Sequence, residues 1–217
     1  WILLGGFKQI GVGTPQNYSE TIQVASSEVK SAEISLDAGA SEIKISTADQ
    51  LVAATASLTS NFATLEQNSN TSGSIQKINF SMKSGDIWFG SFKNQWDIKL
   101  NRNLPISFNV NAGACDADID LSLAKLNAVD IDMGASSLVL KLGEIQSITN
   151  VNIASGASSI TIRVPNNSGV KLYIDDGLNS KELADLKLSG NKTYESNNYN
   201  SASKKIDITA KIGVSSF

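Results

Sequence analysis

The side chains with the clearest chemical potential in this sequence are five aspartates in two alternating runs. Asp116, Asp118 and Asp120 are separated by single residues, and Asp130 and Asp132 follow with the same spacing. Residues two apart in a β-strand point to one face, so each run would line one face of a strand. If the two strands are neighbours, the carboxylates converge, and such oxygen ligands suit a hard cation such as calcium. The alternative is a solvated outer face whose charge discourages aggregation.

The chain lacks residues that most catalytic arrangements require. The chain has no histidine, which excludes Ser-His and Cys-His nucleophile pairs and imidazole-based zinc sites. The single cysteine, Cys115, stands where similar segments carry serine, so we predict a small buried residue and not a nucleophile. The aspartates could act as acid and base only in a concave pocket, and no pocket-forming segment is evident. We therefore expect no catalytic residue, no cofactor and no enzymatic activity.

The third candidate feature is a cluster of aromatic residues in a sequence that has only 6% aromatics. It comprises Trp88, Phe89, Phe92 and Trp96. If exposed, these rings would form a stacking platform for a ligand or a contact surface for a partner. If buried, they would be ordinary core or capping residues, which is the more common role of such a cluster.

A repeated cassette of small residues organises the chain around these candidates. Each copy leads from an apolar strand into a small residue, glycine and more small residues, with glycines at 39, 113, 134 and 156, and a worn copy over 212–217. The last three of these four are 21 and 22 residues apart, and such a period is typical of a solenoid. Glycine would allow the positive φ of a sharp corner, and alanine and serine would keep stacked corners from clashing. We therefore predict an all-β, single-domain, solenoid-like stack of short strands with Gly-Ala-Ser corners.

Alternating apolar residues on both sides of the cassettes predict the strands. In the close repeats the expected inward-facing sets are Ala117, Ile119, Leu121 and Leu123; Val129, Ile131 and Met133; Leu138, Leu140 and Leu142; Val151 and Ile153; and Ile160, Ile162 and Val164. Alternation also favours a strand over an alanine-rich helix for residues 51–58. Residues 61–74 are polar and indicate a loop or hairpin connection, and one helical turn is expected near residues 181–186.

The N-terminus differs in character from the rest of the chain. Residues 1–7 are strongly apolar, although a helix that spans a membrane needs about 20 residues. We interpret residues 1–17 as the end of a membrane segment with a linker, and residues 18–217 as the solenoid-like domain; a first strand is the alternative for the apolar start. The net charge of −3 and the scattered lysines argue against binding of nucleic acid.

The chain also resembles a known family, most densely after Trp96. Residues 96–105, the Asn-Ala-Gly-Ala cassette at 111–114, and residues 164–165, 170–178 and 205–213 are similar to the C-terminal domain of LiaF-like, cell wall-active antibiotic response proteins. This domain is also called a toastrack. The resemblance implies a β-solenoid-like domain behind a small multi-helix membrane region, with no catalytic residues. Characterised members are negative regulators of an envelope-stress two-component system, and other relatives are loosely assigned as adhesins.

Residues and resemblance together predict a non-enzymatic, membrane-tethered interaction domain in bacterial cell-envelope stress sensing or regulation. Its partner would be a membrane or envelope signalling protein, and the resemblance points to a histidine kinase. Exposed strand edges would also allow self-association. The expected location is the cell membrane or envelope. The alternative function is a surface adhesin or carbohydrate-binding module that uses the aromatic cluster.

Overall fold

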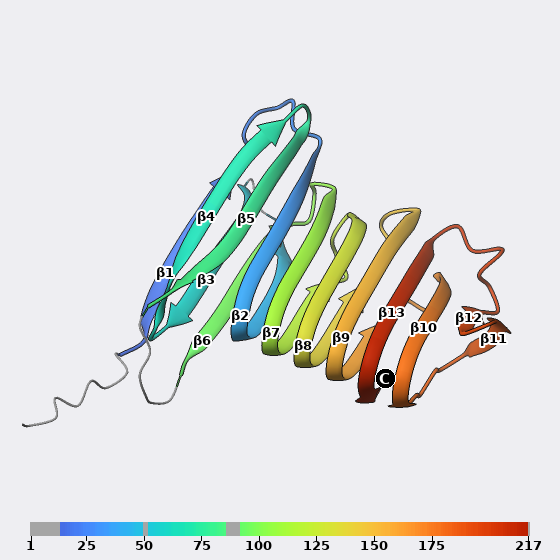
Figure 1. Ribbon diagram of the computed structural model, residues 1–217. Helices are drawn as coiled ribbons and strands as arrows, with labels where there is room; N and C mark the ends of the chain where they lie inside the picture. The colour runs from blue at the N-terminus through green and yellow to red at the C-terminus, as the bar shows by residue number, and fades with distance from the viewer. Residues whose placement is uncertain (1–13, 50–51, 86–91, 217) are drawn as a thin grey trace, which may run out of the picture.

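The computed structural model describes residues 14–49, 52–85 and 92–216, and throughout this part the chain is built from strands and turns (Figure 1). This confirms the predicted all-β fold. No helix long and apolar enough to cross a membrane occurs among these residues. The apolar residues 1–7, interpreted above as the end of a membrane segment, lie outside the described residues.

The strands share a simple pattern of long, mostly parallel elements with short antiparallel ones at the ends. They are β1 (Gln16–Gln23), β2 (Ser31–Ala48), β3 (Val52–Ser60), β4 (Ala63–Ser72), β5 (Ile75–Ser84), β6 (Asn94–Asn101), β7 (Ile106–Leu121), β8 (Leu126–Leu142), β9 (Ile148–Arg163), β10 (Gly169–Ser180), β11 (Leu186–Gly190), β12 (Thr193–Ser196) and β13 (Lys205–Ser216).

The repeating unit is one long strand bent at a corner glycine. We call the part before the glycine the first limb and the part after it the second limb. Each limb pairs in parallel with the same limb of the next coil: Phe108 lies opposite Val129 in the first limbs of β7 and β8, and Ile119 lies opposite Leu140 in the second limbs. The result is one sheet folded along its line of corners, so that two halves face each other, and Figure 1 shows the bent strands standing side by side like slices in a rack.

The order of the strands departs from the order of the sequence at both ends of the stack. Along the sheet the order is β1-β3-β6-β2-β7-β8-β9-β13-β10-β12-β11. At the N-terminal end, β5 pairs with the first limb of β2 and β6 pairs with its second limb, so these two strands together replace one coil. At the C-terminal end the last strand, β13, inserts between β9 and β10. The chain therefore closes its own stack by returning through it.

The core consists of rows of equivalent residues that cross the coils between the two limbs. One row joins, in register, Ile34, Phe108, Val129, Val151, Ile208 and Leu172, all at most 4% exposed. Burying each such side chain contributes roughly 1.5–3 kcal/mol. The predicted inward sets follow this pattern except at coil ends. Leu123 lies in the turn after β7 and is 53% exposed, so its inward assignment was wrong; Ile162 and Val164 are only partly buried.

The corner glycines form a column, and close approach of the backbone explains them better than a positive φ. Among the described cassette glycines only Gly39 has a positive φ, of 62°. A Cβ on Gly134 would lie 3.2 Å from the carbonyl oxygen of Gly113, and a Cβ on Gly156 would lie 3.0 Å from that of Gly134. The column continues from Gly156 to Gly213 and then to Gly177, where the corresponding distance is 2.6 Å. The positive-φ explanation is therefore wrong for most corners: a side chain there would strike the previous coil.

Two local predictions can be compared with the structure. Of the loop and the hairpin predicted for residues 61–74, the structure has the hairpin: residues 63–72 form β4, the first strand of the β4–β5 hairpin. Only its first residue, Ala63, is buried, so the alternation that marks other strands is missing. The helical turn expected near residues 181–186 is absent: residues 181–185 form a non-helical connection, and β11 begins at Leu186. The strand predicted over residues 51–58 is confirmed from Val52 onward.

The glycine column can be tested by adding one methyl group to it. We expect Gly156→Ala to lower the free energy of unfolding by about 1–3 kcal/mol, because its Cβ would press on the Gly134 carbonyl oxygen, which is part of the backbone. The control is Gly190→Ala, whose Cβ would meet the Thr193 Cβ at an ordinary 3.7 Å. Urea unfolding of both variants measures the difference. Equal stability of the two variants would contradict the close-contact explanation.

Candidate functional site

A shallow groove of about 880 Å³ crosses the second-limb side of the corners of β2, β7 and β8. We call it the corner groove. Its floor consists of the small residues that follow the corner glycines, and in one row Ser41, Cys115 and Ser136 are register neighbours. One end is formed by the start of β6 with Phe92. Small side chains keep the floor low because neighbouring coils of a parallel sheet lie only about 4.8 Å apart.

Two buried polar atoms at this end of the groove have no hydrogen-bond partner. Asn94 is 7% exposed, and its Nδ2 donates to the carbonyl oxygens of Ala38 at 3.3 Å and Ala40 at 2.8 Å. Its Oδ1 has no partner in the described structure, and neither has the Oγ of Ser41. Beside them, Gln95 Nε2 donates to Glu42 Oε2 at 2.5 Å. Because buried polar groups are normally paired, these two atoms suggest hydrogen-bonding capacity reserved for something else.

The aromatic cluster is divided between the core and the surface. Trp96 is 2% exposed and packs in the core, so it cannot stack against a ligand. Phe92 is 55% exposed at the end of the corner groove. Its ring meets that of Phe62 edge to face, with the centroids 5.7 Å apart. Trp88 and Phe89 lie outside the described residues. Of the proposed platform, Phe92 is thus the described ring that a partner can reach.

The five aspartates do not converge. Asp116, Asp118 and Asp120 lie on the second limb of β7, whereas Asp130 and Asp132 lie on the first limb of β8, opposite Asn109 and Asn111. Since the sheet folds at the corner between these limbs, the two runs face opposite sides of the molecule. Among the described residues no group of three or more acidic, cysteine or histidine side chains could hold a metal ion. The expected convergence failed because the corner separates residues that look adjacent in the sequence.

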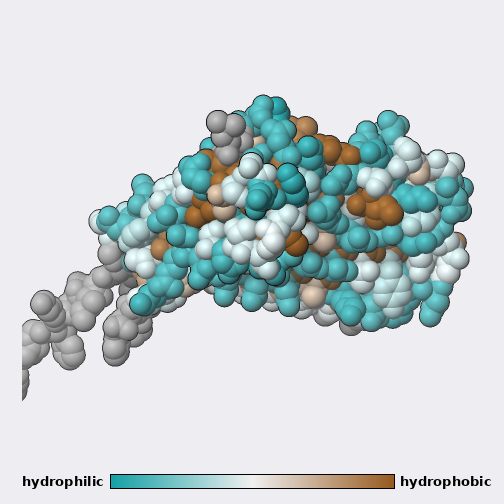
Figure 2. Space-filling view, turned by 90° about the horizontal axis from the view of Figure 1, so that it is seen from above, coloured by the Kyte–Doolittle hydropathy of each residue, from teal (hydrophilic) through white to brown (hydrophobic). Residues whose placement is uncertain are grey.

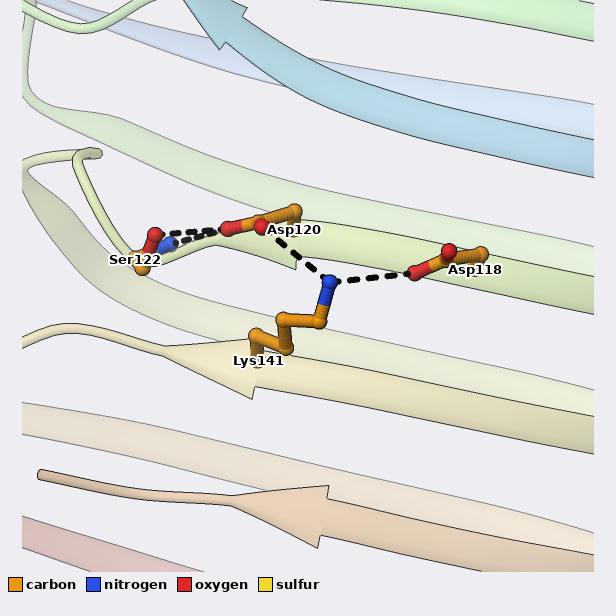
Figure 3. A network of polar contacts seen from close by, with 4 residues as sticks. All are labelled: Asp118, Asp120, Ser122 and Lys141. Atoms are coloured by element: carbon orange, nitrogen blue, oxygen red, sulfur yellow. Dashed lines mark hydrogen bonds and ion pairs between the residues drawn. The ribbon is translucent and has the colours of Figure 1, made fainter.

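A basic and an amide side chain pair with three of the five aspartates. Lys141 Nζ lies 3.3 Å from Asp120 Oδ2 and 3.8 Å from Asp118 Oδ1, as Figure 3 shows. On the other side of the molecule, Asn152 Nδ2 donates to Asp130 Oδ1 at 2.7 Å. Such exposed pairs contribute little to stability, roughly 0–1 kcal/mol each. This arrangement fits a solvated outer face better than a cation site.

Cys115 is a small buried residue, as predicted. It is 7% exposed, and burial, reinforced by the nearby Asp116 carboxylate, raises the pKa of its thiol to about 11. A thiol with so high a pKa is almost entirely protonated at neutral pH and is a poor nucleophile. Although Cys115 contributes to the floor of the corner groove, its place there is that of a small side chain.

Sequence reasoning missed the polar end of the groove. Asn94 and Ser41 carry no motif, and only the register that brings the start of β6 beside β2 makes them neighbours. The pairing of Gln95 with Glu42 in that register was the one accessible signal, since both stand three positions before a strand isoleucine. Recognising this signal would have required knowing that β6 pairs with β2 in the sheet.

A sequence profile of the family described as the N-terminal domain of toast_rack, DUF2154, matches residues 12–163, which is most of the chain. The chain belongs to this family. The matched range ends with β9, so the toast-rack match includes the corner groove, and strands β10 to β13 follow it. The toastrack resemblance drawn from the sequence is confirmed at this level.

The fold recurs in a solved structure. A "putative cell adhesion protein" from Clostridium sporogenes matches with a TM-score of 0.85 at 20% identity, covering 94% of this chain and 97% of that one. At such identity the likeness establishes the shared toast-rack fold. A "putative adhesin" from Bacteroides fragilis covers 96% of this chain and all of its own length at 8% identity, but its TM-score of 0.35 is too low to support an argument. No match was found among the curated proteins.

The raised pKa of Cys115 predicts slow thiol modification. At pH 8 we expect a thiol-specific disulfide reagent to react with the folded protein about 100-fold more slowly than with the protein in urea, because burial leaves little thiolate and restricts access. The absorbance of the released thiol measures both rates, and Cys115→Ser is the blank. Similar rates in the folded and unfolded protein would contradict the buried environment.

Asp120 offers a test of the outer-face network. Hydrogen bonds from Ser122, whose Oγ lies 2.6 Å away, and the nearby Lys141 hold the pKa of Asp120 below its ordinary value. We expect Ser122→Ala to raise that pKa, as carboxyl NMR titration would show. Because the folded-state pKa is lowered, the stabilisation exists above the ordinary carboxyl pKa and is lost as the pH falls through the folded-state value. Ser137→Ala, on the outer face of β8, should leave the Asp120 titration unchanged; an identical titration in both variants would contradict the assignment.

Proposed function

We propose that this toast-rack domain is a non-catalytic interaction domain of the bacterial cell envelope, and that the corner groove is its contact surface. The observation that carries the proposal is Phe92, a 55% exposed aromatic ring at the end of a groove whose adjoining Asn94 holds a buried, unpartnered acceptor. An aromatic anchor beside a desolvated polar group is a frequent composition of binding hot spots. The shallow groove suits the surface of a macromolecule better than a small molecule.

The titratable groups support binding over chemistry. The chain has no histidine, and the Cys115 thiol has a pKa of about 11. Asp118 and Asp120 of the second limb lie beside Lys141, and Asp116 borders the shallow corner groove. Nucleophilic catalysis needs an activated nucleophile, and the described residues offer none. The corner groove can offer hydrogen bonds to polar groups of a partner, and it presents an exposed ring that the partner can cover.

The resemblance to LiaF-like proteins supports a regulatory role in envelope stress. In this proposal residues 1–17 tether the domain to the membrane, and the partner is a membrane signalling protein such as a histidine kinase. Signalling works by displacement: the partner binds the corner groove in one state and leaves it in the other, which requires different affinities in the two states. The domain then acts at the cell membrane or envelope.

Adhesion is the second candidate function. It is favoured by the structural match to a protein described as a "putative cell adhesion protein", although at 20% identity that match establishes the fold alone. Phe92 could serve a surface ligand as well as a membrane partner. The two functions differ in where the partner lies: in the same envelope for a regulator, and outside the cell for an adhesin.

A photo-reactive phenylalanine analogue at position 92 in the intact cell distinguishes these functions. We expect it to cross-link one envelope protein, whereas the same analogue at Leu188, which is 67% exposed on β11, should not. Mass spectrometry of the adduct identifies the class of partner. A signalling protein supports regulation, and an adduct formed only with added extracellular ligand supports adhesion. Equal labelling from both positions would overturn the assignment of the groove.

Once the partner is identified, the variant Phe92→Ala tests whether the Phe92 ring anchors it. We expect an affinity loss of about 2 kcal/mol, roughly 30-fold, because truncation removes the ring that the partner covers. The melting temperature should fall only slightly, because Phe92 is 55% exposed and loses little beyond its edge-to-face contact with Phe62. Leu188→Ala is the matched control, and isothermal titration of the purified partner is the measurement. Unchanged affinity in Phe92→Ala would exclude the ring as an anchor.

A further inference from the structure

The outer face of the first limbs carries residue types that suit β-strands poorly. Along β7, β8 and β9 buried and exposed positions alternate, and six of the exposed ones are asparagine or aspartate: Asn109, Asn111, Asp130, Asp132, Asn150 and Asn152. These first limbs stand in front in Figure 1, and the same side, the lower long side in Figure 2, is mainly hydrophilic or intermediate in hydropathy. Asparagine and aspartate are depleted in strands, and a departure from local preference is expected mainly at functional sites.

A shallow hollow of about 360 Å³ lies within this face, and we call it the face hollow. Its floor includes Ala154 of β9, whose register neighbours are Asp132 of β8 and Lys211 of β13. Both neighbours have longer, exposed side chains. Since each strand spacing is about 4.8 Å, a carboxylate and an ammonium group flank the hollow from strands roughly 10 Å apart. The adjoining row supplies Asn109, Asp130, Asn152 and Thr209.

Charged side chains around the face hollow are paired with one another, but two that line it are not. The surrounding ion pairs on this side are Lys77 with Glu33, Lys171 with Glu195, and Lys192 with Asp175. Asp175 is the register neighbour of Lys211, yet its carboxylate pairs with Lys192. Among the described residues, the side chains of Asp132 and Lys211 form neither an ion pair nor a hydrogen bond. An exposed acid and an exposed base thus border the same hollow without being engaged elsewhere.

The adjoining row is preorganised for hydrogen bonding. Asn152 Nδ2 donates to Asp130 Oδ1 at 2.7 Å, which fixes both side chains on the face. Asn152 Oδ1 and Asp130 Oδ2 have no partner within the described ranges and remain available as acceptors. In register the row continues to Thr209 of β13 and then to Tyr173 of β10, which is 36% exposed. Hydrogen-bonding groups therefore occupy the middle of the face, and an aromatic ring stands one strand beyond Thr209.

We propose that this face binds a neutral oligosaccharide, with one sugar ring in the face hollow and the chain running across the strands toward Tyr173. A hydroxyl group can both donate and accept, so one sugar hydroxyl can donate to the Asp132 carboxylate while a neighbouring one accepts from the Lys211 ammonium group. The phenol ring of Tyr173 offers an apolar surface to the C–H face of a second sugar. The site lies on the opposite side of the molecule from the corner groove and does not depend on the function proposed for that groove.

The same side chains disfavour other classes of ligand. Among the described residues no group of three or more acidic, cysteine or histidine side chains could hold a metal ion. An anion would meet two carboxylates, those of Asp130 and Asp132, and a single ammonium group. A protein partner usually covers an apolar, charge-poor centre, whereas the isoleucines in this lining, Ile131 and Ile153, are 2% exposed. A neutral polyol satisfies the mixed donors and acceptors without adding a charge.

Titration with soluble tetrasaccharides, followed by NMR, tests the proposal. The probes are the β-1,4-linked tetramers of glucose, mannose and N-acetylglucosamine, which are neutral and extended. We expect at least one of them to shift the backbone amide resonances of Asp132, Asn152 and Ala154 and the side-chain amide of Asn152. A sulfated form of the bound tetramer should bind more weakly, because the two aspartates repel it. Absence of these shifts with all three probes, or tighter binding of the sulfated form, would overturn the proposal.

Variants of the protein locate the bound sugar. Ala154→Gln should weaken binding at least about tenfold, because the longer side chain fills the hollow. Its matched control is Thr161→Gln, at an exposed position on the second limb of the same strand. Asp132→Asn keeps the shape of the side chain and should weaken binding about fivefold through loss of a charge-assisted hydrogen bond, and Tyr173→Ser should do so through loss of the ring. Equal affinities of Ala154→Gln and Thr161→Gln, or wild-type affinity of Asp132→Asn, would refute the site.

Competition distinguishes the two sources from which such a sugar would come. Soluble fragments of the source bacterium's own cell wall should displace the bound tetramer if the ligand is an envelope glycan. Glycans released from other cell surfaces should displace it if the domain acts in adhesion. Either result supports the proposal, and displacement by neither would overturn the assignment of this face to a natural glycan.

Discussion

The rest of this structure depends on the contact of one backbone with the next at the corners. Parallel pairing sets neighbouring coils about 4.8 Å apart. At most corners the bend brings the glycine so close to the carbonyl oxygen of the neighbouring corner glycine that a side chain would strike it; at Gly113, whose Cβ would lie 3.7 Å from the Gly39 oxygen, there is more room. Because every coil must place its glycine in this column, the coils share one register, and equivalent residues fall into rows. The column thus fixes which side chains meet across the molecule.

The rows explain why the five aspartates do not form one site. Alternation sends each limb's apolar side chains inward and its polar ones outward, and the corner then turns the outward faces of the two limbs away from each other. Asp118 and Asp130 are only twelve positions apart in the sequence, yet they belong to different limbs and face opposite sides. Lys141, much farther along the chain, lies beside Asp118 because it shares its limb. Proximity follows limb and register, and sequence distance is a poor guide to either.

The fold could be predicted from the sequence where the structure repeats, and it could not be predicted where the repeat ends. Alternation and the glycine period gave the all-β stack, the corners and the buried place of Cys115. They could not reveal β4, whose exposed residues are polar on both faces, or the insertion of β13 between β9 and β10, which no local signal encodes. They also assigned the glycines to a positive φ, because the spacing between stacked backbones becomes visible only in three dimensions. Asn94 and Ser41 were missed for the same reason: their nearness depends on the pairing of β6 with β2.

The corner groove crosses three stacked coils and ends where the stacking of bent strands is broken. Inside the stack, rows of buried side chains fill the space between the limbs. At the N-terminal end the glycine column stops, since the Met82 Cε, and not another glycine, stands against Gly39, and the separate strands β5 and β6 replace a bent one. The corner groove ends at this break, with Phe92 beside it. A solenoid of this kind is stabilised by contacts between neighbouring repeats. Where the repeat ends, fewer positions are constrained by such contacts, so the surface there can differ most from that of the other coils.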